Sequence, residues 1–467
     1  MSNSEQQQQQ KGRRRKRDDK VVRVTKMAPP PPTPIQDIED IASSFSEDET
    51  QKLRVALLNW YDINRRDLPW RRLNHEGSEE EVERRAYAVW VSEVMLQQTR
   101  VQTVISYYNR WMEKWPTIDK LAQASLEEVN EMWAGLGYYR RARFLLEGAK
   151  KIVAEEGRIP KVASLLRKIP GIGDYTAGAI ASIAFKEVVP VVDGNVVRVI
   201  ARLKAISANP KDSSTIKRFW KLAAQLVDPL RPGDFNQALM ELGATVCTPV
   251  NPSCSLCPAT ESCHALSISR HDNSVAVTDY PIKVVKAKQR HDFSAVCVVE
   301  LLGAEKMPEG NQSSSRFILV KRPDEGLLAG LWEFPSVSLD GEVNSSTRRE
   351  KMNRFLKRVF KIDTRKTCSI VLREDIGEFT HIFSHIRLKL YVELLVLHLK
   401  EGEKDDLLKS EDSETTTWKC VDGDVLSSTG LTTSVRKVYS MVQKFKERSF
   451  PSKQIPAGKR SRMAKKT

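Results

Sequence analysis

Four of the seven cysteines lie close together in the sequence, and their spacing points to a metal site. Cys247, Cys254, Cys257 and Cys263 are separated by six, two and five residues, and prolines stiffen this segment. Four thiolates can hold a zinc ion or a [4Fe–4S] cluster. A zinc ribbon prefers two C-x2-C pairs and this segment has one, so the spacing favours the iron–sulfur cluster, in a reducing compartment rather than a disulfide framework. No ligand position looks open for chemistry, which favours a structural role.

Two carboxylates, Glu93 and Asp193, are the candidates for proton chemistry. Glu93 lies among apolar residues in a segment that begins at Trp90, and apolar neighbours raise the pKa of a carboxyl group until it can donate a proton. Asp193 follows the apolar run Val188–Val192, which we expect to be buried. Both also have ordinary structural explanations, because a Glu in the first turn of a helix capped by Ser92 complements the helix dipole, and an Asp caps the helix that follows it.

The elements that must position these residues are helices. Pro170–Gly173 predicts a tight turn between two helical patterns, and the second starts near Asp174. Gly171 and Gly173 permit backbone angles and close approaches that other residues do not, and amides in a turn at a helix N-terminus form a phosphate site. The segment therefore predicts a helix-hairpin-helix that grips a DNA backbone and holds Asp193 beside it. An ordinary αα-hairpin is the structural alternative.

A long helix and a loop with the residue types of a DNA interface lie before this hairpin. Residues 90–115 predict the helix, with apolar residues at helical spacing. Residues 134–143 contain two glycines, Leu136, two tyrosines and three arginines. This composition suits a loop inserted between bases, and a helix-to-helix turn with a basic start to the next helix is the alternative. The charged insert 74–85 is expected to be a surface loop.

The composition favours a DNA-binding class. The chain has 467 residues, enough for two or three domains, and its net charge of +15 and pI near 9.4 favour a polyanionic partner. No apolar run reaches the length of a membrane span, and no secretory signal is recognisable. Residues 1–48 are rich in Gln, basic residues and Pro and are expected to be disordered. The basic run Lys11–Arg17 suits nuclear import or loose DNA contact, with an organelle as the alternative location.

The motifs from about Leu53 to His264 resemble those of the endonuclease III superfamily of DNA glycosylases, and within it the MutY family of adenine DNA glycosylases. The resemblance rests on LPWR (68–71), WVSEVMLQQT (90–99), GLGYYRRAR (135–143), IPGIGDYTAGA (169–179), VDGNVVRV (192–199), FNQALMELGATVC (235–247) and the four-cysteine segment, in matching order. It implies an all-α helix-hairpin-helix glycosylase domain over residues 49–264, with a [4Fe–4S] loop at 247–263 and two lobes around the DNA site.

The resemblance also implies a role for individual residues. Glu93 would protonate the flipped adenine, and Asp193 would stabilise the oxocarbenium ion at the sugar, which is the logic of glycoside hydrolysis by two carboxylates. A base must leave the duplex stack before it can be reached. The remaining positions are Tyr175 and Asn195 on the sugar side, Arg66 and Gln237 in the adenine pocket, and Gln98 and Tyr138 as wedges in the duplex, with Leu136 as a weaker wedge candidate.

Tyr175 separates the subfamilies. Relatives that also cut the strand carry a lysine at this place as a Schiff-base nucleophile, and a tyrosine cannot form an imine; Lys168 and Lys186 lie at other positions. The resemblance therefore implies a monofunctional glycosylase that leaves an abasic site at A:8-oxoguanine and A:G mispairs. The rivals are a bifunctional glycosylase/lyase, a relative that removes thymine or uracil, and a non-enzymatic iron–sulfur protein that binds DNA, in which both carboxylates would be helix caps.

The C-terminal half changes to strand-like patterns. Residues 265–290 are expected to be a linker and residues 291–446 an α+β domain, with strands near 294–301, 316–321 and 388–397 and a helix near 347–359. Residues 326–335 resemble the entry to a Nudix fold. The metal-binding Arg-Glu-x-x-Glu-Glu segment is absent and the helix carries Arg348, Arg349, Lys351, Arg354, Lys357 and Arg358, so we expect a Nudix-like binding module whose cationic helix faces phosphates. In the family this domain recognises 8-oxoguanine, and Phe383, Ser384 and His385 match its Phe-Ser-His loop.

The resemblance implies mispaired double-stranded DNA as the partner, a monomer and no membrane contact. Family members often bind the replication clamp through a Gln-x-x-aliphatic-x-x-aromatic-aromatic motif, and this sequence has no good match to it. Residues 447–467 form a basic tail, which is a second candidate for an import signal.

Overall fold

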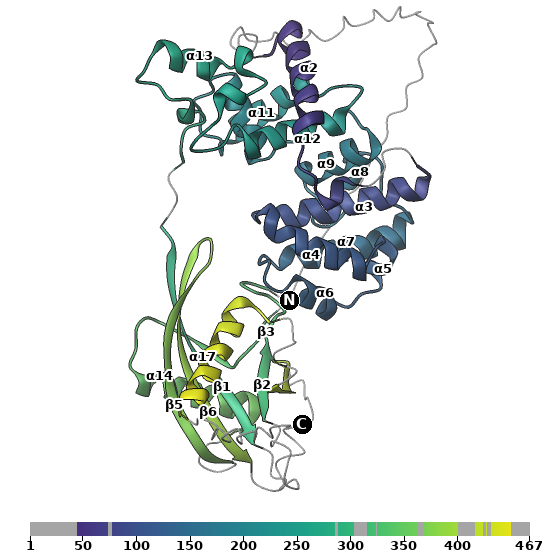
Figure 1. Ribbon diagram of the computed structural model, residues 1–467. Coiled ribbons are helices and arrows are strands. Elements are labelled where there is room, and N and C mark those ends of the chain that lie inside the picture. Colours follow the sequence, from purple (N-terminus) through teal and green to yellow (C-terminus); the bar gives the residue numbers. More distant parts are fainter. Residues whose placement is uncertain are drawn as a thin grey trace, which may run out of the picture. The chain divides into compact units, whose positions relative to one another are not determined.

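The computed structural model describes residues 44–72, 77–284, 288–302, 315–323, 325–362, 368–399, 416–423, 426 and 431–449. Residues 1–43 of the predicted disordered tail (1–48) and residues 450–467 of the predicted basic tail (447–467) lie outside these residues. The described ends of both tails differ from the prediction, because Phe45 is buried, a helix begins at Glu47 and the last helix continues to Ser449. The described part is an all-α domain followed by an α+β domain (Figure 1). None of its helices is long and apolar enough to cross a membrane.

The first domain is built from helices joined by short turns. They are α2 (Glu47–Asn64), α3 (Glu79–Leu96), α4 (Val101–Lys114), α5 (Ile118–Ala122), α6 (Leu126–Trp133), α7 (Arg140–Lys151), α8 (Ala163–Leu166), α9 (Asp174–Phe185), α10 (Gly194–Leu203), α11 (Ser213–Leu226), α12 (Pro232–Thr245) and α13 (His264–His271).

These helices form two lobes with separate apolar cores. Within this domain the first core takes its residues from the continuous stretch 68–191, and Trp90, Trp111 and Trp133 are fully buried in it. The second core combines α2 with α10, α11 and α12, around Phe219 and Phe235. The second lobe is therefore assembled from segments that precede and follow the first lobe in the sequence.

The long helix predicted over residues 90–115 is two helices, since α3 ends at Leu96 and α4 begins at Val101. Helix α3 also begins well before the predicted start at residue 90. Ser78 caps it in a capping box with Glu81, in which the Ser78 amide donates to Oε2 of Glu81 at 2.9 Å. Residues 79–85, predicted as part of a surface loop, are therefore the first two turns of the helix. Ser92 is not an N-cap; it is buried, and its hydroxyl donates to the Val89 carbonyl at 2.8 Å. Glu93 consequently lies in the last turn of α3 rather than in a first turn.

The chain stays with the helical domain beyond the predicted boundary. Residues 264–271, most of them assigned to the linker 265–290, form α13. Further along, Nε of Arg202 on α10 donates to the carbonyl of Tyr280 at 3.2 Å. The connection between the domains is thus shorter than the composition suggested, and residues 285–287 lie outside the described part.

The second domain is a mixed sheet with a helix on each face. Its strands are β1 (Arg290–Leu302), β2 (Arg316–Lys321), β3 (Trp332–Glu333), β4 (Ser336–Leu339), β5 (Cys368–Ile382), β6 (Ile386–Leu399) and β7 (Trp418–Asp422), and its helices are α14 (Ser345–Phe360) and α17 (Thr433–Ser449). The order β3-β2-β1-β6-β5 contains one parallel pair, β1 with β6, while β4 pairs with β1 and β7 with β2.

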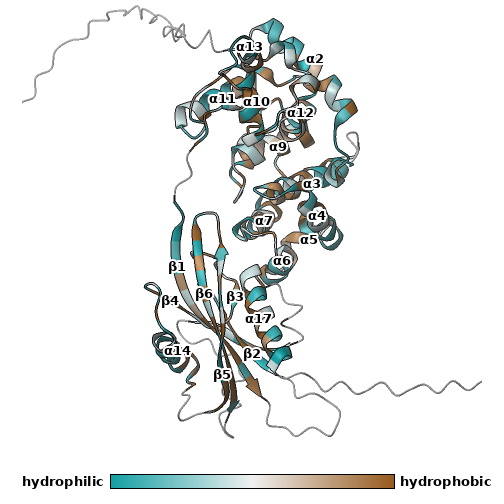
Figure 2. Ribbon diagram, turned by 60° about the vertical axis from the view of Figure 1, so that its left-hand side comes forward, coloured by the Kyte–Doolittle hydropathy of each residue, from teal (hydrophilic) through white to brown (hydrophobic). Residues whose placement is uncertain are grey.

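Each face of this sheet has its own core. Met352 and Leu356 of α14 belong to one, and Val438 and Val442 of α17 belong to the other; Figure 2 shows the two helices on opposite sides of the sheet. The three strands and the helix predicted from the sequence are confirmed. β3, β4, β5, β7 and α17 were not predicted.

Candidate functional site

Glu93 is a buried carboxyl group near the C-terminal end of α3. Its exposed fraction is 6 %, and Val91, Val94 and Met95 beside it belong to the apolar core. Burial raises its pKa to about 7, and the negative charge of Asp193 adds to the rise. The helix end acts in the same direction, because its negative pole disfavours a carboxylate. Glu93 can therefore hold a proton at neutral pH and release it to a partner.

Tyr175, in the first turn of α9, donates a hydrogen bond from its hydroxyl to Oε2 of Glu93. The same hydroxyl lies 3.5 Å from Sδ of Met240 on α12. Burial, together with the nearby carboxylates, raises the pKa of Tyr175 well above its usual value, so the phenol stays a neutral donor. The sequence analysis placed Tyr175 on the sugar side; in the structure its hydrogen bond goes to the acid, where it favours the ionised form and opposes the effect of burial.

Asp193 is the N-cap of α10. Its Oδ1 accepts from the Val196 amide at 2.7 Å, and its Oδ2 accepts from Nδ2 of Asn195 at 2.7 Å. Burial raises the pKa of Asp193, while these hydrogen bonds and the charge of Arg198 oppose the rise. The positive pole of α10 also favours the carboxylate. Asp193 is thus a helix cap, as the structural alternative predicted, and this role is compatible with catalysis. The positive pole of α10 favours an ionised Asp193, whereas the negative pole of α3 favours a protonated Glu93.

Arg198, one turn into α10, connects this end of the site to the cysteine segment. Its Nη2 donates to Oδ1 of Asn195 at 2.8 Å and to the carbonyl of Gly243 at 2.6 Å, and its Nε donates to the carbonyl of Cys247 at 2.8 Å. Sequence reasoning missed this role. Arg198 stands inside the motif 192–199, but its backbone partners lie 45 and 49 residues later.

A small pocket adjoins Glu93. Arg71, Trp70 and Gln237 line it, and its volume of about 20 Å³ has room for a water molecule but not for a purine. Gln237 is buried, and its Oε1 accepts from Nε of Arg71 at 3.2 Å. The predicted position of Gln237 next to the acid is therefore consistent with the structure, and a base can enter only if this pocket widens.

Arg66, predicted to lie in the adenine pocket, does not line this cavity. Its Nε and Nη2 donate to the two carboxylate oxygens of Glu241 at 2.6 and 2.9 Å, and Nη2 of Arg71 donates to the same carboxylate at 2.9 Å. Burial would raise the pKa of Glu241, but the two arginines hold it below its usual value. Arg71 and Glu241 are functional candidates that sequence reasoning missed; the signal was an acidic residue within the apolar run Ala238–Leu242.

Residues 163–185 form the predicted helix-hairpin-helix, with α8, a tight turn and α9. Gly171 has a φ of +79°, and a Cβ there would lie 2.5 Å from Cβ of Phe144. A Cβ on Gly173, the N-cap of α9, would meet nothing within 4 Å, so open space adjoins the first amides of the helix, where a phosphate can approach. The run Val188–Val192 was predicted to be buried, but Val188 is 54 % exposed.

Gln98 and Tyr138 are exposed, as side chains that enter a duplex must be. Tyr138 has an exposed fraction of 48 %, and the φ angles of Gln98 and Tyr138 are +56° and +48°. A non-glycine residue in this region costs roughly 1–2 kcal/mol, so both turns need support from their surroundings. Leu136, the weaker wedge candidate, was wrong: it is buried in the first core, because the loop between α6 and α7 turns back onto it.

The four cysteines line one small pocket together with Arg202. Nη1 of Arg202 donates to Sγ of Cys247 at 3.2 Å, and the Thr260 hydroxyl holds the turn by donating to the carbonyl of Cys257 at 2.7 Å. In the part of the chain that the structure describes, no three Cys, His, Asp or Glu side chains are grouped closely enough to bind a single metal ion. The predicted ligands nevertheless converge on one space.

Phe383, Ser384 and His385 form the turn between β5 and β6. The Phe383 amide donates to the Ile386 carbonyl at 2.8 Å, and the hydroxyl of Ser384 lies 3.1 Å from Nδ1 of His385. Ser384 and His385 are exposed, whereas Phe383 is half-buried. The tip of a long hairpin thus presents two polar side chains to solvent.

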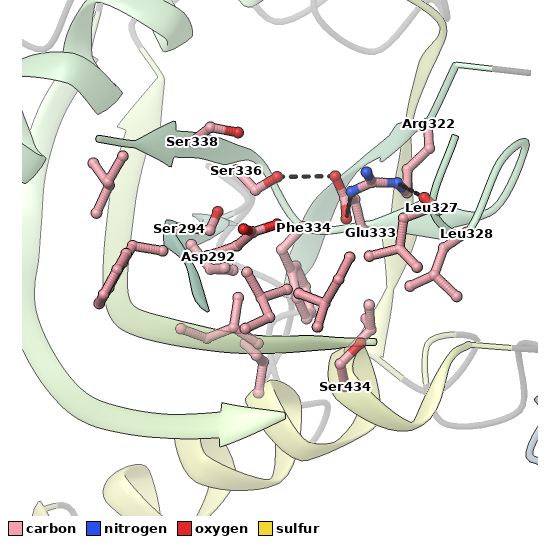
Figure 3. Close-up of a pocket in the computed structure, with 18 of the residues that line it drawn as sticks. Asp292, Ser294, Arg322, Leu327, Leu328, Glu333, Phe334, Ser336, Ser338 and Ser434 are labelled. Carbon is pink, nitrogen blue, oxygen red and sulfur yellow. Dashed lines mark hydrogen bonds and ion pairs between the residues drawn. The ribbon is translucent and has the colours of Figure 1, made fainter. Parts of the chain in front are cut away.

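The Nudix-like domain has a cavity of about 450 Å³ at one end of its sheet. Figure 3 shows Arg322 between the carboxylate of Glu333, 2.7 Å from Nη1, and the carbonyl of Leu327, 2.8 Å from Nε. Asp292, the other carboxylate labelled there, is paired with Arg290 at 2.7 Å. Both acidic groups are therefore neutralised by arginines, which agrees with the absence of the Nudix metal-binding segment from the sequence.

The cationic helix α14 differs from the prediction. It was expected to face phosphates, but its arginines and lysines are largely paired with carboxylates: Arg348 with Asp375, Arg349 with Glu393, Lys351 with Asp340 and Arg354 with Glu350. Two of the acidic partners, Asp375 and Glu393, lie on neighbouring strands, which the sequence pattern could not show. Arg348 and Arg349 thus fix the helix to its own sheet, while Lys357 and Arg358 near its end are exposed.

Comparisons with known proteins agree with this arrangement. Residues 91–225 match the HhH-GPD superfamily of base excision DNA repair proteins, and residues 311–441 match the NUDIX domain. The chain is 62 % identical to the adenine DNA glycosylase of Arabidopsis thaliana over 423 residues, which cover 86 % of this chain and 65 % of that protein, just under two thirds of its length. It is 48 % identical to the adenine DNA glycosylase of Mus musculus (74 % of this chain, 70 % of that protein) and 47 % identical to that of Homo sapiens (75 % and 68 %). The helix-hairpin-helix domain, the Nudix-like domain and this similarity along most of the chain show that it belongs to the adenine DNA glycosylase family.

Proposed function

We propose that this chain removes adenine mispaired with 8-oxoguanine, or with guanine, from double-stranded DNA and leaves an abasic site. The observation that carries the proposal is the pair of carboxyl groups. Glu93 is buried with a pKa of about 7, and Asp193 lies close enough to influence that pKa. Hydrolysis of a glycosidic bond needs such a pair, with one group protonated and the other ionised.

The reaction follows from the two protonation states. Once adenine is flipped into the widened pocket, Glu93 gives its proton to the base, and the bond from C1′ of the sugar to the base breaks with its electron pair leaving on adenine. The carboxylate of Asp193 stabilises the positive charge at C1′. A water molecule then adds to C1′ and gives up a proton, which regenerates the acid.

The contact of Tyr175 supports a monofunctional enzyme. Its hydroxyl, and not an amine, is hydrogen-bonded to Glu93, and a phenol cannot form the imine through which a bifunctional lyase cuts the strand. Lys168 and Lys186 are both exposed. The bifunctional reading is therefore the weaker alternative, and so is a non-enzymatic DNA-binding protein, which gives no reason for a protonated buried Glu93.

The lesion opposite adenine would be read by the β5–β6 turn. Ser384 and His385 can hydrogen-bond an altered base edge, and Phe383 can stack or wedge. This assignment rests on the family motif and on the exposure of the two polar side chains. Direct binding of duplexes with guanine or 8-oxoguanine opposite adenine, to protein with and without Ser384→Ala, tests it.

Cys247, Cys254, Cys257 and Cys263 would hold a [4Fe–4S] cluster. The support is their spacing, their convergence on one pocket and the family to which the chain belongs. When bound, the cluster cross-links the segment between α12 and α13, and Arg198 and Arg202 hold that segment against α10. We further propose a nuclear location and a monomeric protein, the former on the basic run Lys11–Arg17, which lies outside the described residues.

The deciding experiment uses a labelled duplex with one adenine opposite 8-oxoguanine. After incubation with the protein, only half of the sample is treated with hot alkali, and Glu93→Gln serves as the matched control. Strand breakage after alkali alone, absent with Glu93→Gln, supports the proposal. Breakage without alkali that borohydride traps would reveal a lysine nucleophile. Tight binding of the mispaired duplex with no product in either half would favour a binding protein.

A further inference from the structure

One guanidinium group contacts both segments that carry the proposed wedge residues. Arg141, the second residue of α7, donates from Nη1 to the carbonyl of Gln97 at 2.6 Å and from Nη2 to the carbonyl of Gly137 at 3.1 Å. Gln97 directly precedes Gln98, and Gly137 directly precedes Tyr138. The two turns are about 40 residues apart in the chain, yet a single side chain fixes the backbone immediately before each exposed residue.

The same guanidinium completes the end of helix α3. Nη1 also contacts the carbonyls of Val94 at 2.8 Å and Met95 at 3.1 Å, which directly follow Glu93. The last carbonyls of a helix have no partners within it, and the last turn of α3 contains no basic residue. Arg141 supplies the missing donors from another helix. The acid and the two wedge turns are therefore joined to one group.

Arg141 occupies this place against ordinary preferences. A cation near the N-terminus of α7 opposes the helix dipole, and among the described residues no carboxylate is paired with it; burial lowers its pKa to about 10, so it remains charged at neutral pH. Its Nε is buried without a partner in the described part. The rings of Trp133 and Tyr138 lie 5.2 and 5.5 Å from its guanidinium carbon. Contacts to two turns that are about 40 residues apart offset these costs. A residue that breaks several local rules commonly marks a functional position.

We propose that Arg141 is a positioning residue that fixes Gln98 and Tyr138 relative to each other and to Glu93. Both side chains then enter the duplex at a set spacing while the flipped base reaches the acid. The left-handed backbone of both residues is the conformation that these contacts hold. The inference rests on the proposed function, and it adds a residue that touches neither the base nor the sugar.

The test compares Arg141→Lys with Arg158→Lys. A lysine keeps the charge but cannot span two turns, whereas Arg158 is an exposed residue of the same lobe that pairs with Glu79. For each variant we would measure the affinity for an A:8-oxoguanine duplex and for a fully paired duplex, and the single-turnover rate of excision. We expect Arg141→Lys to lower mispair affinity at least tenfold, to leave paired-duplex affinity within about twofold, and to slow excision by about 100-fold. Arg158→Lys should change none of them by more than about twofold.

A double-mutant cycle separates positioning from mere structural support. In a Gln98→Ala, Tyr138→Ala background nothing remains to be inserted, so Arg141→Lys should cost less than about twofold in mispair affinity. A full cost in that background, or equal behaviour of the two lysine variants, would overturn the proposal. The affinity measurements test the positioning role of Arg141 even if the wild-type protein excises no adenine. Absence of excision by the wild-type protein would refute the proposed function and not the positioning role.

A second variant covers the case in which Arg141→Lys does not fold. Thr99→Val removes a hydroxyl that lies 3.4 Å from Nη2 of Arg141 and leaves the guanidinium in place. With an unchanged melting temperature, it should reduce the preference for mispaired over paired duplex by about two- to threefold. An unchanged preference would overturn the proposal.

Discussion

Replacing Tyr175 by phenylalanine should move the activity of this protein to higher pH. If Glu93 acts as the acid, the excision rate is level below its pKa of about 7 and falls tenfold per pH unit above it. The Tyr175 hydroxyl donates to the carboxylate and so stabilises the ionised form. Without this donor the ionised form is less stable, the pKa of Glu93 rises, and the acid stays protonated at higher pH.

The size of the shift follows from the hydrogen bond. A bond to a charged group contributes about 1.5–3 kcal/mol, and about 1.4 kcal/mol corresponds to one pKa unit, so the descending limb should move up by about 1 to 2 pH units. The assay is a single-turnover rate profile between about pH 5.5 and 9.5, read as alkali-labile product. Tyr108→Phe is the control, since Tyr108 is a buried phenol of the same core that contacts Trp70.

Only the position of the limb is diagnostic. The level rate below the limb is free to fall, because the phenol also packs beside Met240. A limb that stays in place, or that moves to lower pH, would refute the reasoning that Tyr175 holds the charged form of the acid. The same shift in Tyr108→Phe would show that loss of any buried phenol is sufficient.

Three further changes test the rest of the site. Glu93→Gln should stabilise the fold above pH 7 but not below pH 4.5, because a pKa raised from 4.5 to about 7 means that ionised Glu93 destabilises the folded state. At about 1.4 kcal/mol per pKa unit, the gain in the free energy of unfolding is about 3 kcal/mol at high pH. Denaturant unfolding at pH 4 and pH 8 measures it, and an equal gain at both pH values would contradict the prediction. Asp193→Asn should slow excision by at least about 100-fold while mispair affinity, measured by fluorescence anisotropy, stays within about threefold; loss of both together would indicate a structural role. Gly171→Ala should lower the free energy of unfolding by about 1–3 kcal/mol, and with it the melting temperature, since the φ of Gly171 is +79° and the new Cβ would meet Phe144. Gly173→Ala should leave the melting temperature unchanged and weaken duplex binding, because a Cβ there meets nothing within 4 Å. Equal melting temperatures for the two variants would argue against this geometry.

The sequence predicted elements best where the pattern is local. The helix-hairpin-helix turn, the strands β1, β2 and β6 and helix α14 depend on glycines and on apolar periodicity, and they lie where expected. The start of α3 had an equally local signal, a Ser three residues before a Glu at 78–81, but the run of charges there resembled a loop. That error placed Glu93 at the wrong end of its helix, with the opposite sign of the dipole effect.

The remaining differences come from contacts between distant residues. Nothing near Arg66 shows that Glu241, 175 residues later, will pair with it. Arg141 likewise finds its carbonyl partners at the end of α3, Val94, Met95 and Gln97, 44 to 47 residues earlier. Leu136 was a wedge candidate, but Gly135 and Gly137 on either side of it, with φ of +106° and +73°, let the loop turn back onto the core. β5 lies at an edge of the sheet, and most of its side chains are exposed or half-buried, so it left little apolar pattern to detect.

The way the two lobes share the chain sets the order in which a nascent protein can complete them. Residues 68–191 are continuous and contain a full core, so this lobe can fold as soon as it leaves the ribosome. Helix α2 emerges earlier, but its apolar face, with Leu53 and Leu57, packs into a core that is completed by later residues, from Val196 to Leu242 and beyond. That face is the surface a chaperone would meet during synthesis. Because α10 belongs to the same core and carries Asp193 at its start, the catalytic pair is assembled only when this second lobe folds.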